Sequence, residues 1–454
     1  MQTASKKVIN GWAMYDWANS VYNLVITSTI FPAYYTAITL TKEGSKVSFF
    51  GHTIENSVLL DYTLAAAYLI IALISPVLSS IADYSGNKKK FMQFFCYVGA
   101  LSCCALFMLT PSMNAAFEPT GFSPFVLEAG MLFFMLAAVG YCGSQVFYNA
   151  YLPEIAAEPD QDRVSAKGFA YGYIGSVLLQ IVCFIIVMKP QLFFIPADPQ
   201  YKYFPARISF VLVGLWWLGF AQIPFKRLPL SAPSTVARNG SVIKHGFQEL
   251  QKVWKQLQGL PVLKRFLRSF FFYSMGVQTV MLAAAIFGSK TLHLPTDILI
   301  LTTLIIQIVA IAGAWLMSKL SGRFGNLSVL AVVILIWVGI CIGAYYTEAE
   351  NNMQFFILGG SVGLVMGGIQ SLSRSTYAKL MPETKDTASF FSFYDVTEKL
   401  AIVIGMTSFG FIEQITGNNM RNSVLALGLY FIIAFILMLF AIGKLKQEKK
   451  AAIQ

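Results

Sequence analysis

Twelve stretches of mostly apolar residues, each long enough to cross a membrane, constrain this chain more than any other feature. An α-helix needs roughly 20 such residues to cross the hydrocarbon core of a bilayer. In lipid the backbone must satisfy its own hydrogen bonds, and a helix does so within one segment. We therefore predict an all-α integral membrane protein with twelve transmembrane helices. The predicted helices span residues 12–38, 58–82, 91–112, 124–152, 166–189, 207–225, 266–289, 297–320, 327–347, 353–378, 388–416 and 423–443.

The amino-acid composition agrees with a membrane location. Hydrophobic residues make up 56% of the chain and charged residues 12%, whereas soluble domains average about 45–50% and about 25%. The net charge of +11 comes from Lys and Arg in short connections between the apolar segments, and these residues do not form one basic face. We therefore expect the lipid bilayer as a partner and no binding of nucleic acid.

The distribution of basic residues predicts the orientation of the helices. Of the 33 Lys and Arg residues, 25 lie on the side that carries both termini, 7 lie on the other side, and Lys399 lies inside a helix. Connections rich in Lys and Arg stay in the cytoplasm. Both termini are therefore predicted to be cytoplasmic. Because no organellar signal is recognisable, we expect a multi-pass protein of a bacterial inner (cell) membrane.

The longest connection divides the predicted helices into two sets of six. We expect an amino-terminal bundle over residues 1–225, a cytoplasmic linker over 226–265 and a carboxyl-terminal bundle over 266–454. Within the linker, residues 244–258 are either a surface helix with one apolar side or a solvated segment with one amphipathic turn. Short loops also match between the halves, as in transporters built from repeats. The matching loops are Tyr151-Leu152-Pro153-Glu154 with Leu380-Met381-Pro382-Glu383, and Asp83-Tyr84-Ser85-Gly86-Asn87 with Gly322-Arg323-Phe324-Gly325-Asn326.

The tight loop after the second predicted helix is a candidate gate. Gly86 permits the bend, and the Asp83 carboxylate can accept hydrogen bonds from the amino terminus of a neighbouring helix. Lys88 follows in the same loop. The alternative is an ordinary basic loop at the cytoplasmic surface. Arg374, near the cytoplasmic end of the tenth helix, is either part of the gate or a basic residue that snorkels to the surface.

Several motifs resemble the major facilitator superfamily, and specifically its "unknown major facilitator" branch, which includes the autophagy-related vacuolar effluxers of fungi. The resemblance covers nearly the whole chain, and it implies two six-helix bundles, alternating access and a central cavity lined by helices one, four, seven and ten. Its fungal members suggest amino-acid export. The motifs are Ala82-Asp83-x-x-Gly86-x-Lys88-Lys89, Tyr15-Asp16-Trp17-Ala18-Asn19-Ser20, Phe147-Tyr148-Asn149-Ala150-Tyr151-Leu152-Pro153-Glu154, Gly172-Tyr173-x-Gly175, Gly368-Ile369-Gln370-Ser371-Leu372-Ser373-Arg374-Ser375 and Phe390-Phe391-x-Phe393-Tyr394 with Lys399.

The chain departs from the superfamily pattern at three positions. Ser79 stands where a glycine usually opens the loop motif, and Tyr84 replaces the usual basic residue. In the second half, Gly322 aligns with Asp83, so that loop has no aspartate. We therefore expect a weaker cytoplasmic latch in the second half.

Polar residues form stripes on four of the predicted helices. On the first helix, Asp16, Ser20, Asn23 and Thr27 follow at i, i+4, i+7 and i+11, and therefore share one face. Such a stripe faces either a water-filled cavity or another helix to which it hydrogen-bonds. We predict that the stripes bind a small-molecule substrate. The predicted substrate-binding residues are Asp16, Asn19, Asn23, Gln145, Tyr148, Asn149, Gln278, Gln370 and Lys399.

The eleventh helix carries three charged residues inside an apolar stretch. Each charge at the centre of a membrane helix costs roughly 2.5–3.5 kcal/mol on insertion scales. Asp395 and Lys399 lie at i and i+4, which is the spacing of an ion pair, and Glu398 is then left without a partner. A desolvated carboxylate without a partner binds a proton more readily than an exposed one. Glu398, Asp16 and Asp395 are therefore the predicted proton-coupling residues.

These features predict a secondary active transporter that moves a small polar solute, amino-acid-like or peptide-like, by alternating access with proton coupling. The alternative is a receptor or scaffold that has the same fold and does not transport. The three histidines and six cysteines show no metal-ligand spacing, and no catalytic constellation or phosphate-binding loop is found. We therefore expect no enzyme activity, metal or cofactor, and a monomer.

Overall fold

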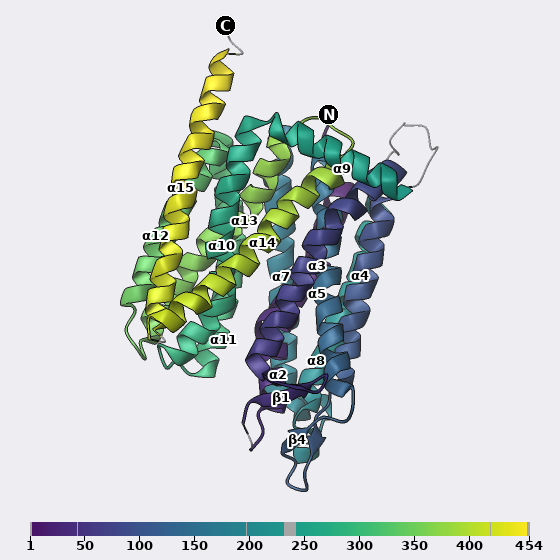
Figure 1. The fold of residues 1–454 in the computed structure, drawn as a ribbon, viewed down its shortest axis with the longest axis vertical. Helices are drawn as coiled ribbons and strands as arrows, with labels where there is room; N and C mark the ends of the chain where they lie inside the picture. Colours follow the sequence, from purple (N-terminus) through teal and green to yellow (C-terminus); the bar gives the residue numbers. More distant parts are fainter. Residues whose placement is uncertain (1, 43, 197, 231–241, 418, 452–454) are drawn as a thin grey trace.

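The computed structural model describes residues 2–42, 44–196, 198–230, 242–417 and 419–451. These residues form one all-α bundle in which both chain termini lie at the same end (Figure 1). We call this the termini-bearing end, and the other the opposite end. The predicted all-α fold with helices at the twelve expected places is confirmed. In the linker, residues 231–241, which include Ser231, Ser234, Arg238, Asn239 and Gly240, lie outside the described residues.

The first half of the chain contains the helices expected before residue 226. Its first predicted helix consists of three consecutive pieces, and the others are single helices. The pieces and helices are α1 (Lys6–Val21), η1 (Tyr22–Thr29), α2 (Ile30–Thr39), α3 (Asn56–Ser85), α4 (Lys88–Ala105), α5 (Val126–Ala150), the short α6 (Leu152–Ile155), α7 (Gln161–Met188) and α8 (Phe204–Arg227). One-turn 3₁₀ helices occupy Leu106–Met108, Glu158–Asp160, Pro190–Phe193 and Pro199–Tyr201.

The second half begins with a surface helix and continues with six long helices. They are α9 (Val242–Gln258), α10 (Pro261–Lys290), α11 (Thr296–Phe324), α12 (Asn326–Tyr346), α13 (Asn352–Leu380), α14 (Thr387–Ile415) and α15 (Met420–Ala451). The α9 helix lies across the termini-bearing end (Figure 1). Its Val253 and Leu257 are buried, and the Trp254 ring lies beside the Phe393 ring of α14 in a tilted arrangement, with ring centres 5.6 Å apart. The surface-helix interpretation of the linker is therefore the correct one for these residues.

Two small antiparallel hairpins protrude from the first half at the opposite end (Figure 1). One pairs β1 (Lys46–Phe49) with β2 (His52–Glu55), and the other pairs β3 (Ser112–Met113) with β4 (Pro119–Gly121). Both hairpins lie in connections between helices. The interior of the protein is formed by the long helices.

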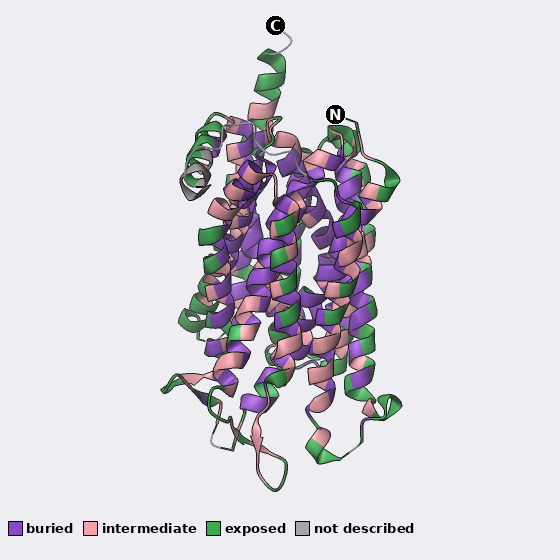
Figure 2. Cartoon of the chain, turned by 90° about the vertical axis from the view of Figure 1, so that its right-hand side faces the viewer, coloured by how far each residue is buried: buried purple, intermediate pink, exposed green. Residues whose placement is uncertain are grey.

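The outer surface of the bundle is apolar, as a membrane protein requires. Buried residues concentrate along the interior, and exposed residues follow the outward faces of the helices (Figure 2). Ten of the described helices are long and apolar enough to cross a membrane as single elements. The other two predicted crossings are the interrupted first helix and α14, which carries Asp395, Glu398, Lys399 and Glu413.

The first predicted helix is not continuous, which corrects the expectation of a regular helix over 12–38. The segment η1 is a π-helix, with backbone hydrogen bonds that reach one residue farther than in an α-helix. Two side chains stabilise its carbonyl groups. The Ser28 hydroxyl donates to the Asn23 carbonyl at 2.9 Å, and the Thr29 hydroxyl donates to the Leu24 carbonyl at 2.7 Å. The wider turn shifts the helical phase, and Thr27 consequently leaves the stripe that begins at Asp16.

Glycines bring α11 and α13 unusually close together. A Cβ atom at Gly363 would meet the Ile306 carbonyl oxygen of α11, and one at Gly367 would meet the Ala310 carbonyl oxygen. Gly313 of α11 has the same relation to Leu364 of α13. Gly363 and Gly367 of α13 and Gly313 of α11 therefore serve backbone-to-backbone packing within the second half.

Candidate functional site

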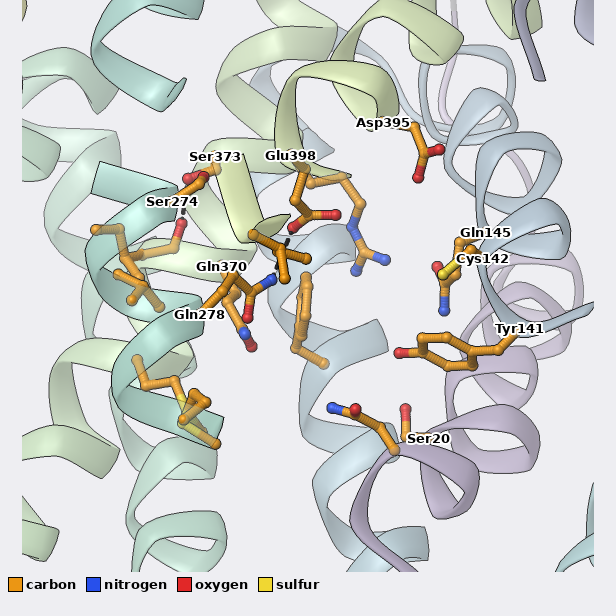
Figure 3. A pocket seen from close by; sticks show the side chains of 18 of the residues that line it. Ser20, Tyr141, Cys142, Gln145, Ser274, Gln278, Gln370, Ser373, Asp395 and Glu398 are labelled. Carbon is orange, nitrogen blue, oxygen red and sulfur yellow. Dashed lines mark hydrogen bonds between the residues drawn. The ribbon is translucent and has the colours of Figure 1, made fainter. Parts of the chain in front are cut away.

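A cavity lies between the two halves of the bundle, near the middle of the helices (Figure 3). Polar residues line it from both halves, so a bound solute would contact both. Figure 3 shows one wall from the first half and one from the second. The labelled residues are Ser20, Tyr141, Cys142 and Gln145 from the first half, and Ser274, Gln278, Gln370, Ser373, Asp395 and Glu398 from the second.

The structure brings most of the predicted substrate-binding residues into this cavity. Two of them lie outside its lining. Asn19 is fully buried inside the first half, and Tyr148 stacks on Trp12 with ring centres 4.5 Å apart. Tyr148 still acts on the site, because its hydroxyl donates to the Asp16 carboxylate at 2.7 Å. The predicted residues that line the cavity are Asp16, Asn23, Gln145, Asn149, Gln278, Gln370 and Lys399.

A buried ion pair joins the two halves at the floor of the cavity, which is its end nearer the chain termini. Arg374 of α13 lies 3.1 Å from the Asp16 carboxylate of α1, and both side chains are at most 5% exposed. Arg374 also donates to the Ser165 hydroxyl at 3.0 Å and to the Asn149 side chain at 3.2 Å. Its guanidinium lies over the Phe169 ring at 4.2 Å. The interpretation of Arg374 as a snorkelling residue is therefore wrong, because its charge is paired in the interior.

Gly168 of α7 makes room for this ion pair. A Cβ atom at this position would lie 2.6 Å from Asp16 Oδ2, 2.8 Å from the Arg374 guanidinium and 2.9 Å from the Tyr148 hydroxyl. These distances are too short for any side chain larger than hydrogen. Glycine at 168 is thus a requirement of the pair and of the approach of α7 to it.

Three of the four charged residues of α14, Asp395, Glu398 and Lys399, form one cluster. Lys399 Nζ lies 3.3 Å from Asp395 and 2.9 Å from Glu398, so the predicted Asp395–Lys399 ion pair is confirmed. The prediction that Glu398 lacks a partner is wrong. In addition to Lys399, the Gln278 amide donates to Glu398 at 3.1 Å. The long side chain of Lys399 reaches both carboxylates because they lie on the same side of the helix.

The π-helical segment borders the cavity. Asn23, Leu24 and Ser28 of η1 line it, and Thr29 also donates to the Gln180 side chain of α7 at 3.0 Å. A π-helical segment inside a longer helix often marks a functional position. Here it sets which side chains of the first crossing face the cavity.

The predicted gate residue Asp83 caps the amino terminus of α14. Its carboxylate accepts from the Ser389 backbone N–H at 2.7 Å, the Ser389 hydroxyl at 2.8 Å and the Ala388 N–H at 3.3 Å. The helix dipole favours an anion at this place. Gly86 ends α3 with a φ of 68°, as the expected bend requires. The loop is therefore a contact between the halves, and the plain basic-loop alternative does not describe it.

Lys88 links the same contact to two further groups. Its ammonium lies 3.4 Å from Asp83, donates to the Thr387 hydroxyl at 2.8 Å and pairs with Glu154. The Thr387 hydroxyl in turn donates to Glu154 at 2.6 Å. This network connects α3, α4 and α6 of the first half with the start of α14.

A second contact between the halves uses an aspartate from a different helix. Asp162, at the start of α7, accepts from Lys379 at 2.6 Å, from the Ser321 hydroxyl at 2.8 Å and from Asn326 at 2.6 Å. The loop with Gly322 indeed lacks an aspartate, but the carboxylate comes from the facing helix. The second-half latch thus has its own buried anion, which alignment of the loops could not show.

Together these contacts close the cavity at the termini-bearing end. Among the described residues, the hydrogen bonds and ion pairs between α1–α8 and α10–α15 all involve residues on that side of the cavity or at its floor. Toward the opposite end the ribbons of the two halves diverge (Figure 1). The structure therefore shows a state closed at one end.

Sequence reasoning missed several residues of the site. Tyr68, Phe169, Tyr173, Gln307 and Tyr394 line the cavity, and Ser165 and Asp162 hold the closed end. An aromatic residue in a membrane helix gives no signal of its own, because most such residues are packing. Tyr173 and Tyr394 were visible only as parts of family motifs.

Comparison with known proteins places the chain in a family. Residues 4–451 match the family described as "Vacuole effluxer Atg22 like". This chain belongs to the Atg22-like family. The branch of the major facilitator superfamily suggested by the motifs is thereby confirmed, and the family covers nearly all of the sequence.

Relatives of the Atg22-like family include bacterial and fungal proteins. The "Uncharacterized MFS-type transporter YxiO" of Bacillus subtilis is 31% identical over 431 residues, which are 95% of this chain and 94% of that protein. "Autophagy-related protein 22" of Kluyveromyces lactis is 25% identical over 419 residues, which are 84% and 79% of the two chains. The chain is thus related to transporters, in agreement with the prediction that it is not an enzyme.

Solved structures share the fold. The Escherichia coli fucose:proton symporter aligns with a TM-score of 0.67 at 16% identity, over 96% of this chain and 97% of that one. The proton:xylose symporter aligns with a TM-score of 0.63 at 15% identity, over 95% and 94%. At these identities the likeness shows the major facilitator fold alone.

Proposed function

We propose that this transporter carries a small polar solute, amino-acid-like or peptide-like, by alternating access between the two ends of the bundle. The observation that supports it is the central cavity, because amide, hydroxyl and charged side chains line it from both halves. A solute held between two halves that rock against each other is exposed first to one side of the membrane and then to the other.

The contacts at the closed end supply the gate of this cycle. The Asp83–Ser389 cap, the Asp162–Lys379 pair and the Asp16–Arg374 pair all join the halves and must separate when the termini-bearing end opens. If both termini are cytoplasmic, as the distribution of basic residues predicts, the described state faces outward.

Proton coupling is the second part of the proposal. Asp16, Asp395 and Glu398 are carboxylates in the cavity lining, and each has a basic partner there. A proton that neutralises one of them weakens its ion pair. Neutralised Asp16 in particular loosens the bridge to Arg374, and this couples proton binding to opening of the termini-bearing end.

Transport by reconstituted protein tests the proposal. Proteoliposomes would be supplied with each of the twenty amino acids and a set of dipeptides, with and without an imposed pH gradient. We expect concentrative uptake of at least one compound, driven by the gradient. The Glu398→Gln/Asp16→Asn variant should lose gradient-driven uptake and keep exchange of solute for solute.

A matched control is Asp61→Asn. Asp61 is a carboxylate of α3 that does not line the cavity, so its replacement should leave both modes of transport intact. Equal gradient-driven uptake by the double variant and the unmodified protein would overturn proton coupling. Absence of flux for every compound in every mode would overturn the amino-acid-like or peptide-like substrate.

A further inference from the structure

The charges that line the cavity do not cancel. Asp16 and Arg374 form one pair with no net charge. On α14, Lys399 is the single cation between Asp395 and Glu398. When these five side chains are ionised, the cavity therefore carries one surplus negative charge, and it lies on the α14 side.

Of the two carboxylates on α14, Asp395 is the less fully paired. Lys399 Nζ lies closer to Glu398, at 2.9 Å, than to Asp395 Oδ1, at 3.3 Å, and Glu398 also accepts from Gln278. Asp395 Oδ2 is buried and has no hydrogen-bond partner among the described residues, although Asp395 is only 4% exposed. Buried acceptors are nearly always paired. A donor that a ligand brings would therefore satisfy this oxygen.

Tyrosine rings surround the same space. The face of an aromatic ring attracts a cation, so rings beside an acidic group favour a cationic ligand. Lys399 Nζ already lies 5.9 Å from the centre of the Tyr68 ring. The tyrosines that line the cavity are Tyr68, Tyr141, Tyr173, Tyr273 and Tyr394, from five different helices.

The basic groups of the cavity are already occupied. Arg374 donates to Asp16, Ser165 and Asn149. Lys399 lies between two carboxylates. A carboxylate on a solute would have to displace these partners, whereas an ammonium group meets a free acceptor.

We propose that the cavity recognises an organic amine through its ammonium group, with Asp395 Oδ2 as the principal acceptor and Glu398 beside it. This inference rests on the proposed function, since it takes the cavity to be the solute site. It narrows the ligand class: the ammonium group is required for binding, and a carboxylate on the same molecule is not. In Figure 3, Asp395 and Glu398 both project from α14 into the cavity.

Three forms of the same compound show whether binding requires the positive ammonium group or the negative carboxylate. The probes are alanine, glutamine and phenylalanine, each as the free amino acid, as the carboxamide, which is a cation, and as the N-acetyl derivative, which is an anion. Binding to the purified full chain is measured by the shift in melting temperature over a concentration series. We expect carboxamides to bind at least as tightly as the free amino acids, and N-acetyl derivatives about tenfold or more weakly, as loss of a charge-assisted hydrogen bond implies.

Two variants assign the effect to Asp395. Asp395→Asn keeps the shape and should abolish the preference for carboxamides over N-acetyl derivatives, whereas Asp395→Glu should retain most of it. Asp61→Asn serves as the control and should bind like the unmodified protein. An N-acetyl derivative that binds as tightly as its carboxamide would overturn the inference, and so would a panel in which no carboxamide binds.

Failure of this inference is distinguishable from failure of the proposed function. If proteoliposomes transport a solute and the N-acetyl derivatives bind best, the transport proposal is supported and the inference that binding requires an ammonium group is wrong. If the carboxamides bind selectively and no flux is found in any mode, the inference about the ammonium group is supported and the transport proposal is wrong.

Discussion

Asp16 and Arg374 lie 358 positions apart in the sequence, and their side chains meet 3.1 Å apart at the floor of the cavity. They come from the first and tenth predicted membrane crossings, one in each half. Because both are buried, neither charge can be satisfied by solvent in this state. The pair therefore links the chemistry of the cavity directly to closure of the termini-bearing end.

Removal of one member of this pair should favour opening of that end. In Arg374→Ala the Asp16 charge stays buried without its cation, a change that costs about 3–5 kcal/mol for buried pairs in general. Spin labels at Arg163 and Arg323, which are exposed on opposite halves at this end, would report the distance between α7 and α11. We expect a longer distance in Arg374→Ala, and a smaller loss of stability in Asp16→Asn/Arg374→Gln, where both charges are gone. An unchanged distance in Arg374→Ala would show that the pair does not hold the gate.

Gly168→Ala should disturb the same pair without changing any charge. The added methyl group would occupy space held by Asp16, Arg374 and the Tyr148 hydroxyl, so either these buried side chains or α7 must shift. The same spin-label distance should lengthen, and the melting temperature should fall. Gly219→Ala is the control, because nothing lies within 4 Å of its added Cβ. In a helix such a change stabilises by about 0.4–1 kcal/mol. Equal behaviour of both variants would refute the steric role of Gly168.

Asp83→Ala should weaken the contact between α3 and α14. It removes the cap of the α14 amino terminus, and loss of a helix cap costs about 0.5–2 kcal/mol. It also leaves Lys88 with Glu154 as its remaining carboxylate. Thermal unfolding would measure the loss. Asp160→Ala provides the comparison, because Asp160 pairs with Arg163 at the surface, where ion pairs contribute about 0–1 kcal/mol. A loss no greater than that of Asp160→Ala would contradict the capping role.

The π-helical segment should depend on two hydroxyl groups. In Ser28→Ala/Thr29→Val the Asn23 and Leu24 carbonyls lose their side-chain donors. We expect faster hydrogen–deuterium exchange over residues 22–30 and altered transport, because the side chains of η1 that line the cavity change position. Thr63→Val, which removes a hydroxyl that donates four residues back in the regular helix α3, should leave exchange in 22–30 unchanged. Unaltered exchange in the double variant would mean that the backbone alone maintains the π-helix.

The number and place of the membrane crossings follow from the sequence, because a bilayer imposes a minimum apolar length on each helix. The one segment where this reasoning failed is the first crossing. A π-helical turn differs from an α-helical one only in which carbonyl each N–H meets, and the apolar composition is the same. Ser28 and Thr29 show their role only once their donors are seen to reach five residues back.

The polar residues of the cavity were found in part by helical spacing. Asp16, Asn23 and Gln145 were expected to line it because they share polar stripes, and they do. Asn19 was also expected to line the cavity, but it is fully buried and lies outside the lining. Helical periodicity gives a face and does not say which neighbour that face meets.

The sequence by itself determined the all-α membrane fold, the family and most of the polar residues that line the cavity, because these depend on local composition, spacing and motifs. Only the tertiary structure decided the ion pairs between the halves: Arg374 for Asp16, and Lys379 for Asp162, the anion of the second latch. The physical reason is that a buried charge is stabilised by whichever opposite charge the packing of distant helices brings within about 4 Å, and linear order carries no record of that distance.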